Sequence, residues 1–165
     1  MKFMDLRALF TDSDCFDFST VLQLSGEPRD RLRIQLHRWI KAGRLMPLRK
    51  GLYAFSETFR RHSLNPAVLA GWIYAPSYLS LQWALGFYGL IPERVVTHTS
   101  VTSRQTSHFE NAVGRFDYRH VQPGLFFGYG HVPVGGDEAR VASPEKALLD
   151  FFYLESGPWT EARMQ

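Results

Sequence analysis

The sequence predicts an α+β protein in which an N-terminal winged helix-turn-helix is followed by a small mixed α+β domain. The first observation is a concentration of positive charge. Residues 27–61 contain ten Lys or Arg and three Asp or Glu, a net charge of +7, in a chain whose net charge is +3. The second is the order of patterns in that segment, where a basic amphipathic stretch precedes two short apolar runs joined by a basic turn. This combination is typical of a nucleic-acid-binding unit.

The basic stretch that begins at Pro28 predicts an α-helix. Proline is favoured in the first helical turn, where its missing N–H group would have no helical partner in any case. Apolar residues recur at the spacing of one helical face and predict the side that packs on the core: Leu32, Leu36, Trp39 and Ile40. Ile34 falls near the outward face, so this pattern is imperfect. Gly43 follows where helices commonly end on a glycine in the left-handed conformation.

The two apolar runs, residues 45–48 and 52–55, predict a β-hairpin. The three residues that join them are Arg49, Lys50 and Gly51, and a glycine in such a short loop is a typical turn signal. Pro47 cannot donate a backbone hydrogen bond, so the first strand is expected at the edge of its sheet. An edge hairpin with a basic tip fits the wing of a winged helix.

The residues before this segment predict two supporting helices. Residues 19–24 form the nearer one, with Ser19 as its N-cap and Ser25 and Gly26 as the turn into the basic helix. Residues 1–10 predict the first helix, whose apolar side carries Phe3, Leu6, Leu9 and Phe10. The expected order is therefore helix, helix, turn, helix, strand, wing and strand.

Charge and helical phase predict which side chains contact double-stranded DNA. Arg29 and Arg33 lie near the start of the basic helix and are candidates for base edges, because arginine can bond guanine through two hydrogen bonds. Lys41, Arg49 and Lys50 are candidates for phosphate contacts, which position a protein without reading the sequence. The full set of predicted DNA-binding residues is Arg29, Arg31, Arg33, His37, Arg38, Lys41, Arg49 and Lys50.

The domain boundary is predicted at a polar break. Residues 1–57 form the DNA-binding domain, residues 58–64 a linker, and residues 65–165 the second domain. In that domain we expect a helix capped by Asn65, a helix over residues 81–88, and a last helix capped by Ser143. Strands are expected at residues 95–101, 114–121, 125–129 and 140–142. The last helix is expected to bury Ala147, Leu148, Phe151 and Phe152.

Composition and motifs argue against several other classes. The single cysteine, Cys15, excludes an internal disulfide and a four-cysteine zinc site. Acidic residues interrupt the N-terminal segment, which lacks the pattern of a signal peptide, and no apolar stretch is long enough to span a bilayer. We therefore expect a cytoplasmic protein that uses no membrane. Dinucleotide, phosphate-loop and zinc-protease motifs are absent, and the six histidines show no metal-ligand spacing, so no metal and no cofactor are predicted.

No catalytic residue is assigned, and the protein is not expected to be an enzyme or to have a small-molecule substrate. A nuclease or transferase that uses residues between Ser100 and Asp150 is a weaker alternative. Lys146 and Asp150 are four residues apart on a predicted helix, the spacing of an ordinary surface ion pair. The acidic cluster that a two-metal site requires is missing.

Five segments in a fixed order carry a resemblance to a known family. They are RKGLYAF after residue 48, PSYLSLQWALGFYGLIPE from Pro76, VTSRQT from Val101, FDYRHV from Phe116 and ASPEKALLDFFYL from Ala142. Together they resemble the AbiE-type antitoxin and transcriptional regulator family of bacterial abortive-infection systems. The resemblance runs from the basic helix to Leu154 and is specific as an ordered set, although no single motif is.

The resemblance implies an N-terminal winged helix that represses its own promoter at inverted repeats. It also implies a C-terminal domain that neutralises a cognate toxin similar to a nucleotidyltransferase. The resulting hypothesis is a sequence-specific DNA-binding regulator that acts as an autorepressing antitoxin. The alternative is a protein-interaction module that neutralises its partner without significant DNA binding.

Overall fold

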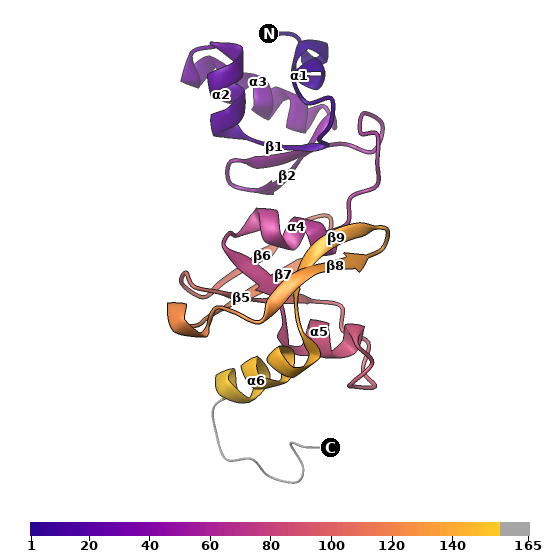
Figure 1. Cartoon of the computed structure of the whole chain (residues 1–165). Helices are drawn as coiled ribbons and strands as arrows, with labels where there is room; N and C mark the ends of the chain where they lie inside the picture. Colours follow the sequence, from indigo (N-terminus) through magenta and orange to yellow (C-terminus); the bar gives the residue numbers. More distant parts are fainter. Residues whose placement is uncertain (156–165) are drawn as a thin grey trace. The chain divides into compact units, whose positions relative to one another are not determined.

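The protein is a mixed α+β chain, and the computed structural model in Figure 1 describes residues 1–155. Within those residues it has six α-helices and two β-sheets. The chain divides into two compact units. The first comprises Met1–Pro66 with Phe109–Gly114, and the second comprises Ala67–His108 with the chain from Arg115 onward. Residues 156–165, which the sequence assigned to the second domain, lie outside the described residues.

The first unit combines three helices with a three-stranded sheet (Figure 1). Its elements are α1 (Phe3–Leu9), β1 (Cys15–Asp17), α2 (Phe18–Ser25), α3 (Arg29–Lys41), β2 (Leu45–Arg49) and β3 (Leu52–Phe55). The strands are antiparallel in the order β1-β3-β2, so β2, with Pro47, is an edge strand as predicted. The sequence interpretation missed β1, because three residues are too short to show a period.

The N-cap of α2 differs from the prediction. The helix begins at Phe18, and Asp17 rather than Ser19 is its cap. The Asp17 carboxylate accepts a hydrogen bond from the Thr20 backbone N–H at 2.8 Å and another from the Thr20 hydroxyl at 2.7 Å. A carboxylate satisfies the free N–H groups of a first turn as well as a hydroxyl does and also interacts favourably with the helix dipole. Gly26 ends α2 in the left-handed conformation.

Helix α3 buries the face that its periodicity predicted. Leu32 and Leu36 are buried, while Trp39 and Ile40 pack against the same core from its edge. The helix begins one residue after Pro28, and Gly43 follows it with a φ of +70°. Ile34 points outward and is 54% exposed. The core against which α3 packs consists of Phe3, Leu6, Phe16, Val21, Leu32, Leu36, Leu45 and Phe55.

Helix α1 contributes less to this core than predicted, because its second turn is partly open. Phe3 and Leu6 are buried, whereas Leu9 is 40% exposed. A charged residue takes a buried place instead. The Arg7 guanidinium is held by the carbonyl oxygens of Phe59 and Phe10 and by the carboxylate of Asp14. These acceptors reduce the free-energy cost of burying the Arg7 guanidinium, because its N–H groups remain hydrogen-bonded.

The second unit is built on a six-stranded sheet. Its strands are β4 (Ser77–Leu79), β5 (His98–Thr102), β6 (Ser107–Glu110), β7 (Arg115–His120), β8 (Tyr129–Val134) and β9 (Asp137–Ala142), in the order β6-β7-β5-β4-β9-β8. Of β6, Ser107 and His108 belong to this unit. Strand β4 pairs with β9 in parallel and with β5 antiparallel. Strands β4 and β6 were not predicted. The strand predicted at residues 125–129 is not present: a 3-10 turn covers Pro123–Leu125, residues 126–128 are irregular, and β8 begins at Tyr129.

Three helices cover this sheet. Figure 1 shows α4 (Pro66–Ile73) on one side, with α5 (Leu81–Phe87) and α6 (Pro144–Leu154) on the other. Ser143 caps α6 as predicted, and its hydroxyl accepts a hydrogen bond from the Lys146 backbone N–H. Among the helices of residues 1–155, none combines the length and apolar character that a membrane span requires.

The buried face of α6 is not the predicted one. Leu148 and Phe152 are exposed, at 42% and 45%, whereas Lys146 and Asp150 are buried with Ala147. The expected surface ion pair is therefore an internal one, with Lys146 Nζ 2.6 Å from Asp150 Oδ1. The i, i+4 spacing is the same for a surface pair and a buried pair, so the error lies in which side of the helix meets the sheet.

Candidate nucleic-acid interface

A hollow of about 550 Å³ on the first unit brings together three of the predicted DNA-binding residues. Arg29 and Arg33 come from the first turns of α3, and Lys50 comes from the turn between β2 and β3. The remaining lining residues are Phe18, Gly51 and Tyr53. A helix start and a hairpin tip therefore present positive charge to one concave surface, which is where an anionic polymer would be attracted.

The two arginines share a side of α3 because they are four residues apart. Both guanidinium groups lie near the ring of Phe18. The centroid is 5.4 Å from the Arg29 Cζ and 5.9 Å from the Arg33 Cζ. At that range the face of an aromatic ring attracts a cation. Phe18 therefore gathers the two positive groups at one end of the hollow.

Backbone contacts fix Phe18 beside the hairpin turn. Its N–H group donates to the Gly51 carbonyl oxygen at 2.8 Å. Gly51 has a φ of +82°, a backbone conformation that residues other than glycine rarely adopt. The start of α2 and the tip of the hairpin are thus joined at the floor of the hollow. The Asp17 cap holds the same helix start from its other side.

The other predicted DNA-binding residues do not line this hollow. Arg31 Nε lies 3.7 Å from Glu27 Oε2, and Arg49 donates from Nη1 to the Lys50 carbonyl oxygen at 2.8 Å. Because each residue advances a helix by about 100°, Arg31 and Arg38 lie roughly half a turn round α3 from Arg29. His37, Arg38 and Lys41 are exposed further along the helix. Arg38 and Lys41 extend the positive surface, and none of the three residues lines the hollow.

Two lining residues, Phe18 and Tyr53, were missed by the sequence interpretation. Phe18 was placed before the helix that it begins, because Asp17 was not taken as the cap. Tyr53 was assigned to the wing strand only as an apolar residue. It is half-buried, and its ring centroid lies 5.8 Å from that of the buried Phe16. Taking Asp17 as the N-cap would have placed Phe18 at the start of α2, but not beside Arg29 and Arg33.

Two carboxylates stabilise the first unit, and one of them, Asp17, caps the helix that carries Phe18. Burial raises the pKa of Asp17, but hydrogen bonds from Ser19 and Thr20 outweigh that effect and hold the pKa below its usual value. Burial also raises the pKa of Asp14. Hydrogen bonds from the backbone N–H groups of Arg61 and His62, together with the Arg7 charge, lower this pKa by more, so that it lies below its usual value. Both groups therefore favour the ionised state in the folded protein.

We expect the first unit to lose stability in acid because of these carboxylates. A depressed folded-state pKa gives stability that is complete above the ordinary pKa of 3.8 and is lost as the pH falls through the lower folded value. Urea unfolding followed by circular dichroism at pH 5 and pH 3 should show the loss. Asp17→Asn keeps a capping oxygen but cannot ionise, so its loss should be smaller. An unchanged pH dependence in this variant would contradict the role of Asp17.

The acid on which the nuclease alternative depends, Asp150, is fully occupied by internal contacts. It is 2% exposed and accepts hydrogen bonds from the hydroxyls of Tyr78 at 2.9 Å and Ser80 at 2.8 Å, in addition to Lys146 Nζ. Lys146 also donates to the Leu125 carbonyl oxygen and lies over the ring of Phe127. Burial and the Asp150 charge raise the pKa of Tyr78. This network has the properties of a structural link between α6 and the sheet.

Metal-ligating residues do not gather elsewhere in the described chain. Within residues 1–155 there is no group of three or more His, Cys, Asp or Glu side chains arranged to hold a metal ion. Cys15 is a free, buried thiol, and burial raises its pKa to about 11. A protonated thiol is a poor nucleophile and a poor metal ligand.

Comparisons with known proteins add no family to this description. No protein-family model matches the chain, and no curated protein is significantly similar to it.

Proposed function

We propose that the first unit is a winged helix-turn-helix that binds double-stranded DNA, and that the protein is a sequence-specific transcriptional regulator. The observation that carries this proposal is the hollow into which α3 and the β2–β3 turn direct Arg29, Arg33 and Lys50. In such units a helix enters the major groove and the hairpin follows the backbone. The order α2, α3, β2, β3 supplies those two parts.

The proposed roles follow from where the cations lie. Arg29 and Arg33, at the start of α3, contact base edges, where a guanidinium can make two parallel hydrogen bonds. Lys50 on the hairpin turn contacts phosphate, and Arg49 and Lys41 extend that contact. Arg31 and Arg38 add positive charge along the exposed side of α3, and His37 adds a polar contact there.

The target is proposed to be an operator with inverted repeats upstream of the protein's own coding sequence, as the resemblance to AbiE-type regulators implies. Fluorescence anisotropy with that DNA and with a duplex of the same composition in scrambled order tests this. We expect binding to the upstream DNA to be at least about tenfold tighter, since specific sites usually exceed random DNA by far more. Equal affinity for the two duplexes would remove the sequence-specific part of the proposal.

A second candidate function is an antitoxin surface on the second unit. The observation that favours it is the exposure of four large apolar side chains on α6: Leu148, Leu149, Phe152 and Tyr153. Apolar patches of this kind mark protein interaction sites more often than single exposed residues do. The proposed partner is a nucleotidyltransferase-like toxin encoded by a neighbouring gene.

Co-expression with the product of that gene tests the second candidate. We expect the two proteins to purify together and Leu149→Asp to abolish the complex, because a charge would enter an apolar interface. Ile34→Asp, at an exposed apolar residue on α3, is the matched control and should leave the complex intact. Loss of the complex in both variants, or in neither, would contradict a toxin site on α6.

A further inference from the structure

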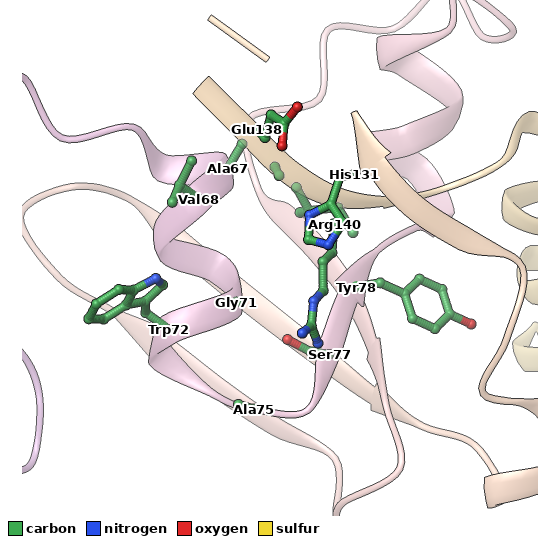
Figure 2. Close-up of a pocket in the computed structure, with 12 residues that line it drawn as sticks. Ala67, Val68, Gly71, Trp72, Ala75, Ser77, Tyr78, His131, Glu138 and Arg140 are labelled. Carbon is green, nitrogen blue, oxygen red and sulfur yellow. The ribbon is translucent and has the colours of Figure 1, made fainter. Parts of the chain in front are cut away.

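The second unit contains a hollow of about 240 Å³ whose lining differs from that of the DNA site. It lies between α4 and the strands β4, β8 and β9 (Figure 2). The α4 side includes three small residues, Ala67 and Gly71 four positions apart on the helix and Ala75 just after it, together with the larger Val68 and Trp72. Small side chains leave room for the apolar part of a ligand.

A free guanidinium lies opposite this wall. Arg140 is an exposed residue of β9, and Figure 2 shows its side chain extending across the hollow toward Ser77. Within residues 1–155 no acidic side chain forms an ion pair with this group. Arginine presents several N–H donors in one plane, a geometry that matches carboxylate and phosphate oxygens. As far as residues 1–155 are concerned, the guanidinium is available to an added anion.

A second unused donor lies at the same end of the hollow. Ser77 is 2% exposed, and its Oγ has no hydrogen-bond partner among residues 1–155. A buried hydroxyl without a partner is unfavourable, so a group that supplies an acceptor is bound more tightly. Both Ser77 and Arg140 line the hollow. One oxyanion can accept hydrogen bonds from both.

We propose that this hollow binds a small organic carboxylate, with its oxygens held by Arg140 and Ser77 and its apolar part against Ala67 and Gly71. The volume is below the range of about 300–1,000 Å³ that is usual for ligand pockets, which limits the ligand to a compact acid. Glu138 also lines the hollow, and its negative charge repels a doubly charged phosphate more strongly than a singly charged carboxylate. The proposal does not depend on DNA binding, because all lining residues belong to the second unit.

Titration of the ¹⁵N-labelled full chain, followed by amide chemical shifts, tests the proposal. The probes are isobutyrate, its neutral counterpart isobutyramide, and inorganic phosphate. We expect saturable shifts at amides of α4 and β9 with isobutyrate and none with the other two. Arg140→Gln should weaken binding at least about tenfold, because charge-assisted hydrogen bonds are lost. The variant should stay folded, because Arg140 is exposed.

Two serine variants distinguish an effect on ligand binding from an effect on folding. Ser77→Ala should weaken isobutyrate binding several-fold while leaving thermal stability near that of the parent, because it removes a hydroxyl that has no internal partner. Ser100→Ala is the matched control, since Ser100 is equally buried with an unpartnered hydroxyl but does not line the hollow. It should bind isobutyrate as the parent does.

The proposal is overturned by any of three results. Isobutyrate shifts that never saturate at millimolar concentrations would exclude a site for small acids. Equal binding of isobutyramide, or preferential binding of phosphate, would exclude a carboxylate as the recognised group. Unchanged affinity in Arg140→Gln would show that the anion is held elsewhere.

Discussion

Arg33→Ala should weaken binding to the operator by about 1–3 kcal/mol and have little effect on random DNA, if Arg33 contacts a base edge. The reason is that a guanidinium bonded to guanine through two hydrogen bonds discriminates against the other bases. Arg33 lies near the start of α3, beside Phe18 and in the same hollow as Lys50. Fluorescence anisotropy on the operator and on a scrambled duplex measures both losses.

The matched control removes the same charge from the second unit. Arg94 is exposed there, and Arg94→Ala changes the net charge by the same amount. We expect it to bind both duplexes nearly as the parent does. An Arg33→Ala loss that is equal on the two duplexes would make Arg33 a phosphate contact. A loss no larger than that of Arg94→Ala would take Arg33 out of the interface.

Asp150→Ala should lower the free energy of unfolding of the second unit by about 3–5 kcal/mol, the usual result of removing one partner of a buried ion pair. The variant leaves Lys146 buried without its counter-charge and deprives the Tyr78 and Ser80 hydroxyls of their acceptor. Unfolding in urea, followed by circular dichroism, measures the change. If the variant showed no cooperative unfolding transition in urea, the second unit would be destabilised even more than expected.

A double-mutant cycle gives the control for this prediction. Lys146→Met removes the buried cation, so the pair Lys146→Met with Asp150→Ala should be less destabilised than the sum of the two single variants. Glu145→Ala removes an exposed acid from the same helix and should change stability by about 0.5 kcal/mol or less. If Asp150→Ala behaved like Glu145→Ala, the buried network would not stabilise the fold.

The parts of the fold that were predictable are those with long, regular patterns. Helix α3 was located because its apolar residues repeat over three turns and because Pro28 and Gly43 mark its ends. The hairpin followed from a glycine turn between two apolar runs. Strands β1 and β4, with three residues each, carry no readable period and depend on their sheet partners.

The candidate DNA site was predictable in its charges but not in its framework. Arg29, Arg33 and Lys50 could be named because charge and helical phase are properties of the sequence. Phe18, which lies under both guanidinium groups, could not be named before its backbone contact with Gly51 was known. Such tertiary contacts join segments more than thirty residues apart, and no local pattern encodes them.

The error at Lys146 and Asp150 has a different cause. On an isolated helix, leucine and phenylalanine are expected to take the buried side. In α6 the buried side instead carries Asp150, which accepts hydrogen bonds from the buried hydroxyls of Tyr78 and Ser80. The polar partners on the sheet, and not the helix sequence, select the buried face. The exposed apolar side then remains for another contact.

The most direct test of DNA binding is the salt dependence of operator affinity. Phosphate contacts release counterions, so the logarithm of the binding constant should fall linearly with the logarithm of salt concentration, by about 0.9 for each contact. We predict a steep negative slope for the parent and a slope shallower by about 0.9 for Lys50→Ala. A flat response, or a slope that Lys50→Ala leaves unchanged, would contradict a DNA interface formed by α3 and the β2–β3 turn.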